Sequence, residues 1–581
     1  MGAPPREVAL GPAASLRRAA RRAAPKSLLG WAPPLTLALF LGPIAVGLAA
    51  TLLPAFGVLP ALGGTEPSLG PLRAALAAPG VGTALLLSLT TGFAATALSL
   101  ALALLLAAAW HGRPALDRAR RLLAPVLALP HAALAIGLAF VLAPSGWLVR
   151  LAAGPLGLER PPDIALVGDP AGLALVAGLV VKETAFLLLA ILAALGQCDA
   201  DRAVRVARSL GYRPLAAWAK AVLPRLYPQI RLPVYAVLAF SLSVVDMALI
   251  LGPATPPTFA VLVLRWFDDP DLALRFQAAA GAVLHLAVTA GAILAWRGGE
   301  AAAARLGRRF LSDGRRGGEG GAARGLAAAG AGAVAGLAAL SALALALWSV
   351  ARHWRFPAAL PAGPTLANWQ GAGGLAAPLL TTVATAGAAT AIALGLSLAC
   401  LEWERRAGLH PTARVLWLLY LPLIVPQIAF LFGVQIVLVL LGLDGGWTAL
   451  IWIHALFVLP YVYLTLADPY RSLDPRYARA GACLGAGPWR VFWRITLPLL
   501  RRPVAAAAAV GVAVSTAEYL PTLFAGAGRL TTLATEAVAR AGGGDRRAVA
   551  VAAFLQMLLP LLAFAAALAL PERRGRGRAG G

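Results

Sequence analysis

The sequence predicts an all-α polytopic membrane protein made of two parallel six-helix repeats related by a pseudo-twofold axis. Of its 581 residues, 60% are hydrophobic and only 13% are charged, which is too apolar for a soluble globular protein. Apolar runs of about 20 residues, enough for a helix to cross a hydrocarbon core of about 30 Å, recur along the chain. A polar loop with the same internal spacing occurs once in each half, which indicates an internal duplication.

The apolar runs predict twelve membrane-spanning helices, six on each side of a polar centre. We expect the first six at 31–53, 81–109, 122–143, 171–196, 230–252 and 276–296. We expect the second six at 326–350, 375–401, 415–442, 448–468, 503–525 and 547–570. Because each half holds an even number of spans, the two repeats run parallel, related by an axis along the membrane normal.

These spans divide the chain into five segments. They are an N-terminal segment 1–30, a first half 31–300, a linker 301–325, a second half 326–570 and a tail 571–581. The linker contains Gly314-Arg-Arg-Gly-Gly-Glu-Gly-Gly321, a composition that predicts a flexible tether. Two pairs of segments support the duplication: 86–96 is similar to 380–390, and Leu127-Ala-Leu-Pro130 is similar to Leu419-Tyr-Leu-Pro422.

The formal charge of +25 is explained by the placement of the basic residues. Most Lys and Arg fall in the N-terminal segment, the centre, the tail and the loops on the same side of the predicted membrane. The positive-inside rule places that side, with both termini, on the cytoplasmic side of a bacterial inner membrane. We therefore expect a lipid bilayer and no nucleic acid as partner. The three cysteines, at 198, 400 and 483, suggest neither a disulfide nor a metal site.

The duplicated loop lies between spans 4 and 5 (199–229) and again between spans 10 and 11 (471–502). In each copy a Gly is followed three residues later by a Pro and thirteen residues later by a second Pro, which Leu precedes. These positions are Gly211, Pro214, Leu223 and Pro224 in the first copy, and Gly485, Pro488, Leu497 and Pro498 in the second.

The spacing predicts a short helix lying along the cytoplasmic membrane surface in each loop. The glycine ends the preceding helix, the first proline suits the first position of the short helix, and the second proline ends it. Residues at helical spacing predict one apolar face per copy: Leu215, Trp218 and Val222, and Trp489, Phe492, Trp493 and Thr496. Such a face fits a groove in another protein; the alternative is a helix lying on lipid headgroups.

The two loops resemble the motif Glu-Ala-Ala-x3-Gly-x9-Ile-x-Leu-Pro of permeases from binding-protein-dependent ATP-binding-cassette (ABC) importers. The matching residues are Ala207, Gly211, Leu223 and Pro224, and Ala480, Gly485, Ile495, Leu497 and Pro498. The chain most resembles fused twelve-span permeases of ferric-iron, thiamine and related importers. In both copies Arg, at positions 205 and 479, stands where the motif has Glu, which predicts a partner with a complementary acidic site.

The resemblance implies a type I importer transmembrane fold whose short helices are coupling helices. It further implies two copies of a separate ABC ATPase and a periplasmic or lipid-anchored solute-binding protein. In this chain Lys26, Lys182 and Lys220 follow Pro, Val and Ala, so no Gly-Lys-Ser/Thr phosphate loop can form. ATP and Mg²⁺ are therefore expected on the partner. No zinc-protease or serine-hydrolase motif is present, and we expect no catalytic residue, no bound cofactor and no enzyme activity.

Charged residues inside predicted spans are candidates for the solute path, because each costs about 2.5–3.5 kcal/mol to insert. Asp246 and Glu518 occupy corresponding spans, and two acids facing each other across the axis favour a cationic or cation-complexed solute. The alternative is that neighbouring hydroxyl groups cap each acid. Lys182 and Glu183 are adjacent and point to different helix faces, so Lys182 belongs either to the path or to an interhelical structural pair.

A secondary transporter of the major-facilitator type is the alternative function, since it also has six plus six parallel spans. Its Gly/Asp/Arg signature between spans 2 and 3 is approached only loosely by Gly112-Arg-Pro-Ala-Leu-Asp117-Arg118, with no good copy at 402–406. The duplicated loops favour the ABC permease. Iron, thiamine, a polyamine, a phosphonate and an anion all remain open as the solute.

Overall fold

The computed structural model describes residues 28–318, 320–409 and 413–570, and in these ranges the chain is helical, without a β-sheet. The tail 571–581 and most of the predicted N-terminal segment 1–30 lie outside the described residues.

The first half consists of long helices joined by shorter ones. Its elements are η1 (Leu28–Trp31), α2 (Ala32–Ala55), η2 (Pro60–Leu62), α3 (Gly70–Ala77), α4 (Val81–Ala109), α5 (Pro114–Ala128), α6 (His131–Leu142), α7 (Trp147–Leu156), α8 (Leu173–Gln197), α9 (Ala200–Ser209), α10 (Pro214–Ala221), α11 (Leu223–Ser243), α12 (Asp246–Leu251), α13 (Phe259–Asp268) and α14 (Leu274–Ser312), and its two η segments are 3₁₀ turns.

The second half follows the same plan. Its elements are α15 (Gly321–Ser349), α16 (Ala367–Gln370), η3 (Gly371–Leu375), α17 (Ala376–Ala407), α18 (Ala413–Ile424), α19 (Gln427–Leu440), α20 (Trp447–Arg471), α21 (Pro475–Cys483), α22 (Pro488–Val491), the π-helical turn η4 (Phe492–Thr496), α23 (Leu497–Leu499), α24 (Arg501–Ala517), α25 (Leu520–Gly526), α26 (Leu533–Ala541) and α27 (Arg546–Leu568).

Among the described residues, nine helices are long and apolar enough to cross a membrane, and eleven if each of two bent helix pairs forms one span. These eleven overlap with eleven of the twelve predicted spans. The remaining one, 230–252, corresponds to α11 and α12, and the N-terminal part of α11 carries Arg225 and Arg231. The number twelve therefore stays a prediction.

Four predicted spans are broken helices, which corrects the expectation that each is continuous. Two break at a proline: α6 follows Pro130, and α19 follows Pro426 with a bend of 88° from α18. Proline lacks an N–H and disfavours helical backbone in the preceding residue. Pro422 lies inside α18, so the partner of Pro130 is Pro426 and not Pro422 as the sequence similarity suggested.

The other two breaks also occupy corresponding positions. One separates α11 from α12 at residues 244–245, and the other separates α24 from α25 at residues 518–519. The similarity of 86–96 to 380–390 is confirmed by a shared contact. Ser88 Oγ accepts a hydrogen bond from the N–H of Phe259 at 2.8 Å, and Thr382 Oγ1 accepts one from Leu533 at 2.9 Å.

The first helix of each half packs against the other half. Helix α2 packs against α19, and α15 packs against α6. At the first contact the N–H of Gly433 donates to Thr51 Oγ1 at 3.0 Å, and a Cβ on Gly433 would collide with the Gly47 carbonyl. At the second, a Cβ on Gly137 would lie 2.7 Å from Ser341 Cβ. The two halves are therefore interlocked through glycine contacts.

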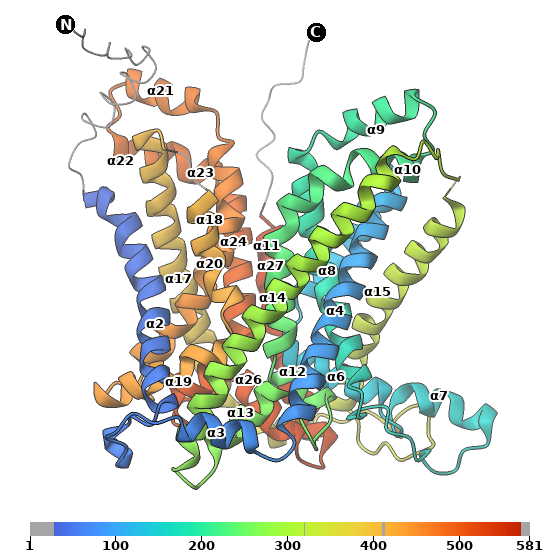
Figure 1. The fold of residues 1–581 in the computed structure, drawn as a ribbon, viewed down its shortest axis with the longest axis vertical. Coiled ribbons are helices and arrows are strands. Elements are labelled where there is room, and N and C mark those ends of the chain that lie inside the picture. The colour runs from blue at the N-terminus through green and yellow to red at the C-terminus, as the bar shows by residue number, and fades with distance from the viewer. Residues whose placement is uncertain (1–27, 319, 410–412, 571–581) are drawn as a thin grey trace, which may run out of the picture.

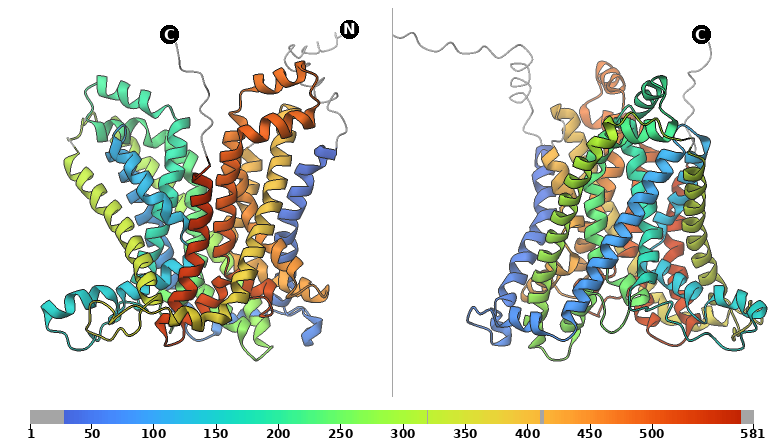
Figure 2. Two further views of the ribbon diagram at one scale, coloured as in Figure 1. Left: turned by 180° about the vertical axis from the view of Figure 1, so that it is seen from behind. Right: turned by 45° about the vertical axis from the view of Figure 1, so that its right-hand side comes forward.

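The duplicated loops lie at one end of the molecule, on opposite sides of the helix bundle (Figure 1). Helix α2 begins and α27 ends toward that same end, whereas α3, α7, α13 and α26 lie at the opposite end. Turning the molecule shows the two arms that carry α9–α10 and α21–α23 well separated (Figure 2). This arrangement agrees with the prediction that both loops face the same side of the membrane.

The linker between the halves is much shorter than the predicted tether 301–325. Helix α14 continues to Ser312 and α15 begins at Gly321, because 301–312 is rich in Ala, Leu and Arg, which favour helix. The remaining connection, residues 313–320 with 319 outside the described residues, is called here the inter-half strap.

Candidate functional site

In the first duplicated loop, the structure places the glycine and the first proline as predicted. Gly211 has φ +87° after α9, a backbone conformation that favours glycine, and Pro214 is the first residue of α10. The second proline does not end the short helix, however. Leu223 and Pro224 form the first turn of α11, a position that proline tolerates for the same reason as the start of α10.

In the second loop, Gly485 has φ +79° and Pro488 begins α22 as predicted. The short helix runs from 488 to 499 through the π-turn η4 and bends by 75° into α24. Pro498 lies inside its last turn, which again differs from the prediction. A proline within a helix removes one hydrogen bond and crowds the carbonyl four residues earlier, and the wider π-turn before Pro498 provides the extra room.

The predicted aromatic face is exposed only in the second loop. Trp489 is 55% and Trp493 is 60% exposed, whereas Phe492 between them is buried and packs edge-on against both rings. Thr496 is also buried. The Arg406 guanidinium, at the end of α17, lies 5.0 Å from the centre of the Trp489 ring, an arrangement that stabilises the position of the indole.

In the first loop the prediction of a cytoplasm-facing aromatic helix is wrong. Trp218 is 2% exposed and Val222 is 1% exposed, and Leu215 is half-buried. No residue of α10 is exposed. One side of the helix packs into the bundle and the inter-half strap covers another, a tertiary contact that the local sequence does not reveal.

The other motif residues lie on α9 and α21, beside the short helices. The motif's second small position is buried in both copies, as Ala207 and as Gly481, which contacts Val491 and Ile495. Ala480 is exposed. Arg205 and Arg479 are both exposed and make no ion pair within the described residues. Their guanidinium groups are therefore free to meet a partner.

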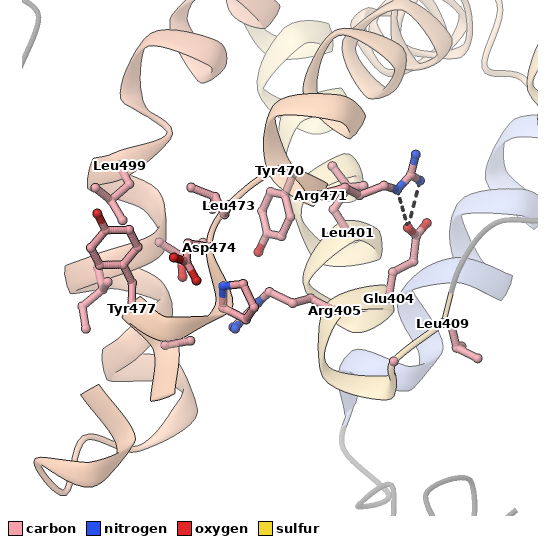
Figure 3. A pocket seen from close by; sticks show the side chains of 15 residues that line it. Leu401, Glu404, Arg405, Leu409, Tyr470, Arg471, Leu473, Asp474, Tyr477 and Leu499 are labelled. Carbon is pink, nitrogen blue, oxygen red and sulfur yellow. Dashed lines mark hydrogen bonds and ion pairs between the residues drawn. The ribbon is translucent and has the colours of Figure 1, made fainter. Parts of the chain in front are cut away.

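A cavity of about 230 Å³ separates the second loop from the ends of α17 and α20 (Figure 3). Two of its charged lining residues form ion pairs with acids of α17: Arg471 binds Glu404 at 2.9 Å, and Arg405 binds Glu402 at 2.6 Å. A second cavity of about 350 Å³ lies between α9 and the start of α11. The first cavity therefore lies between the second loop and the bundle, whereas the second cavity is lined by residues of the first loop itself.

Among the intramembrane residues, Lys182 on α8 caps the broken helix α5. Its Nζ donates to the carbonyl oxygens of Val126 at 3.2 Å and Leu127 at 3.0 Å, and to that of Leu129. The last carbonyls of any helix lack an intrahelical partner, and a cation there is favoured by the helix dipole. The three N–H donors of Lys182 are used by these three acceptors.

Asp246 and Glu518 lie at the two corresponding helix breaks, are 7% and 9% exposed, and are close enough to interact electrostatically. The structure also brings Gln427, the first residue of α19, close enough to Glu518 to interact with its carboxyl group. His454 stabilises the same break by bonding Ser515 Oγ at 2.8 Å and Thr522 Oγ1 at 3.0 Å.

Sequence reasoning did not assign Gln427 to this cluster. One sequence feature could have indicated it: Gln427 directly follows the proline that breaks the helix, just as His131 follows Pro130. Broken helices that present polar groups near the middle of the membrane are a feature of solute sites in transporters.

The fold and the paired loops define a polytopic helical permease. Residues 391–576 match the family described as "Binding-protein-dependent transport system inner membrane component". The inner membrane ABC transporter permease protein YnjC of Escherichia coli is 33% identical over 499 residues, covering 85% of this chain and 89% of the relative. The chain belongs to this family of ABC transporter permeases.

Shorter similarities cover parts of the chain. The molybdenum transport system permease protein ModB of Mycobacterium bovis is 34% identical over 163 residues, which is 26% of this chain and 61% of ModB. The spermidine/putrescine transport system permease protein PotC of Escherichia coli is 30% identical over 89 residues, 15% of this chain and 34% of PotC.

These findings confirm several expectations from the sequence. The chain is an all-α, multi-pass inner-membrane protein with the type I ABC permease fold. It is a permease and not an enzyme. Membership of a binding-protein-dependent system implies an ATPase and a solute-binding protein as partners.

Proposed function

We propose that this chain is a fused twelve-span permease subunit of an ATP-driven importer, similar to ferric-iron and thiamine permeases. It forms the solute path and is moved by two copies of a separate ABC ATPase. A periplasmic or lipid-anchored solute-binding protein delivers the solute, and both termini and both loops face the cytoplasm. The observation that carries the proposal is the pair of duplicated loops at one end of the bundle.

The chemistry of the loops supports contact with an ATPase. No Asp or Glu lies between Asp201 and Asp246, or between Asp474 and Glu518. The acids of the two loops, Asp199, Asp201 and Asp474, are fewer than the arginines, so each loop presents net positive charge to the cytoplasm. Each short helix leads directly into a long helix, α11 or α24, so that a displacement of the loop reaches the membrane domain. ATP and Mg²⁺ bind the partner.

We further propose that the path runs between the halves past the helix breaks, with Asp246 and Glu518 facing the solute. Lys182 interacts electrostatically with Asp246 but uses its donors on α5. Within the part of the chain that the structure describes, neither acid forms a salt bridge. An acidic path favours a cationic or cation-complexed solute over an anion. Of the solutes that the relatives' names mention, this chemistry fits spermidine and putrescine better than an oxyanion of molybdenum.

The coupling role is tested by the charge reversal Arg479→Glu. We expect the variant to bind the ATPase at least tenfold more weakly than the wild type, because the arginine meets an acidic site on the partner. The matched control is Arg501→Gln, beyond the short helix. Equal ATPase affinity for wild type and Arg479→Glu, measured by titrating purified ATPase into nanodisc-embedded permease, would contradict the proposed contact.

A further inference from the structure

The two candidate ATPase-contacting regions differ in what they expose. In the second loop, Trp489 and Trp493 are more than half exposed, with exposed Arg490 and Arg494 beside them. In the first loop, no residue of α10 is exposed and its tryptophan, Trp218, is buried. The duplication of the sequence has therefore not produced two equal surfaces.

Trp218 packs into the core of the bundle, and the inter-half strap covers a second stripe of α10. The carboxylate of Asp313 accepts a hydrogen bond from Lys220 of α10 at 2.5 Å. The N–H of Arg213 donates to the carbonyl of Arg316 at 2.9 Å. Farther along the strap, a Cβ on Gly317 would lie 2.7 Å from Ala216 Cβ. These contacts follow residues 213, 216 and 220, one stripe of the α10 surface.

Further contacts show that this side of α10 is built to hold the strap. The Lys220 ammonium lies 4.8 Å from the centre of the Phe310 ring on α14 and 5.2 Å from that of Tyr212. Its side chain is only 8% exposed. The same ammonium holds the pKa of Asp313 below its usual range, so the carboxylate is charged and paired at neutral pH.

The strap and α9 together present a basic surface at this end of the molecule. Arg205 and Arg208 on α9 are exposed, and so are Arg315 and Arg316 on the strap. Gly211 lies against the Arg316 guanidinium, 3.1 Å from where its Cβ would be, which makes the α9 turn and the strap one continuous surface. No exposed aromatic residue lies on α9, α10 or the described part of the strap.

We propose that the inter-half strap is part of the surface that binds one ATPase copy, an inference that rests on the proposed function. The two copies then meet chemically different surfaces of the same chain. The first is made by α9 and the strap and exposes arginines without aromatic residues; the second is made by the helix 488–499 and exposes two tryptophans beside its arginines. The partner of both is the same ABC ATPase, whose receiving groove has apolar walls and an acidic rim.

The first experiment asks whether the strap stays in place when the ATPase binds. Leu215→Cys and Gly320→Cys are combined after the native cysteines are replaced by alanine, because the Cβ atoms at these positions would be 3.7 Å apart, within disulfide range. The probe is the ABC ATPase that co-purifies with the wild-type chain, produced separately. Native mass spectrometry then counts ATPase subunits per permease in oxidised and reduced samples.

We expect two ATPase subunits per permease in both samples. The reduced sample is the matched control, since it carries the same substitutions without the cross-link. If oxidation lowers the count from two to one and reduction restores it, the strap must leave α10 before the ATPase docks, and the proposal is overturned. If the wild type itself binds no ATPase, the proposed function fails instead.

The second experiment asks whether the two surfaces are unequal. The double variant Trp489→Ala/Trp493→Ala loses the exposed aromatic anchors, and we expect about 30-fold weaker binding of one ATPase copy with the other unchanged. The double variant Arg315→Ala/Arg316→Ala keeps the main chain of the strap. We expect it to weaken binding of the other ATPase copy and to reduce the salt dependence of that binding step.

Combining all four substitutions should weaken binding of both ATPase copies. If instead either double variant weakens binding of both ATPase copies equally, or if the arginine variant leaves ATPase binding unchanged, the strap is not part of a distinct docking surface.

Discussion

The role of Lys182 is the prediction that the geometry defines most sharply. Replacing it by Met keeps a similar volume but removes three hydrogen bonds to carbonyl oxygens at the end of α5. Of these oxygens, that of Val126 keeps another donor, the N–H of Leu129 at 3.2 Å. Hydrogen bonds to a charged group contribute about 1.5–3 kcal/mol each, so three of them contribute at least about 4.5 kcal/mol. Removing the buried ammonium recovers about 2.5–3.5 kcal/mol of insertion cost. We therefore expect Lys182→Met to lower the free energy of unfolding by at least about 1–2 kcal/mol.

The assay is unfolding of the purified protein in mixed detergent micelles by increasing SDS, followed by tryptophan fluorescence. Lys182→Arg is the matched control, because it keeps the charge and several donors and should lose less stability. Solute uptake by folded Lys182→Met should persist at reduced temperature, since the ammonium serves α5 and not the solute. A Lys182→Met variant that is as stable as the wild type but fails to transport would refute this reasoning and indicate that Lys182 belongs to the solute path.

Three other changes test the fold, the path and the strap. Gly433→Ala should destabilise the protein in the same SDS assay, because its Cβ collides with Gly47, whereas Gly387→Ala, with no neighbour within 4 Å, should not; equal stability would contradict the glycine packing. Asp246→Asn combined with Glu518→Gln should abolish uptake of a cationic solute while ATPase binding is retained, and unchanged uptake would remove the acids from the path. Because pairing holds the pKa of Asp313 below its usual range, the strap should stay on α10 above that usual pKa and loosen as the pH falls through the lowered value. Hydrogen exchange of the strap follows this, and release of the strap already near neutral pH would contradict the ion pair.

Helices with one continuous apolar run could be located from the sequence. The predicted spans 81–109 and 171–196 agree closely with α4 and α8, and 448–468 lies within α20. Hydrophobicity decides these elements because the bilayer requires every backbone group inside it to be paired within the segment. The broken spans were missed for the same reason. Apolar residues continue through the breaks, and only prolines mark two of them.

The candidate site was predictable as far as it depends on local sequence. Gly211 and Gly485 have positive φ and Pro214 and Pro488 begin short helices, as their residue types demand. The burial of α10 could not be predicted, because it depends on packing of Trp218 into the bundle and on a strap about a hundred residues away in the chain. The capping of α5 by Lys182 is likewise an interaction between distant segments. Composition alone suggested a flexible linker where a helix and a packed strap are found.

We propose that movement of this membrane domain is driven by a separate ATPase acting on the two loops. The most direct measurement is solute uptake into proteoliposomes that hold the purified chain, with and without its ATPase and solute-binding protein, after ionophores have collapsed all ion gradients. We expect uptake only when ATPase, binding protein and hydrolysable ATP are all present. Uptake driven by an ion gradient across vesicles that contain the chain alone would contradict it and favour a secondary transporter.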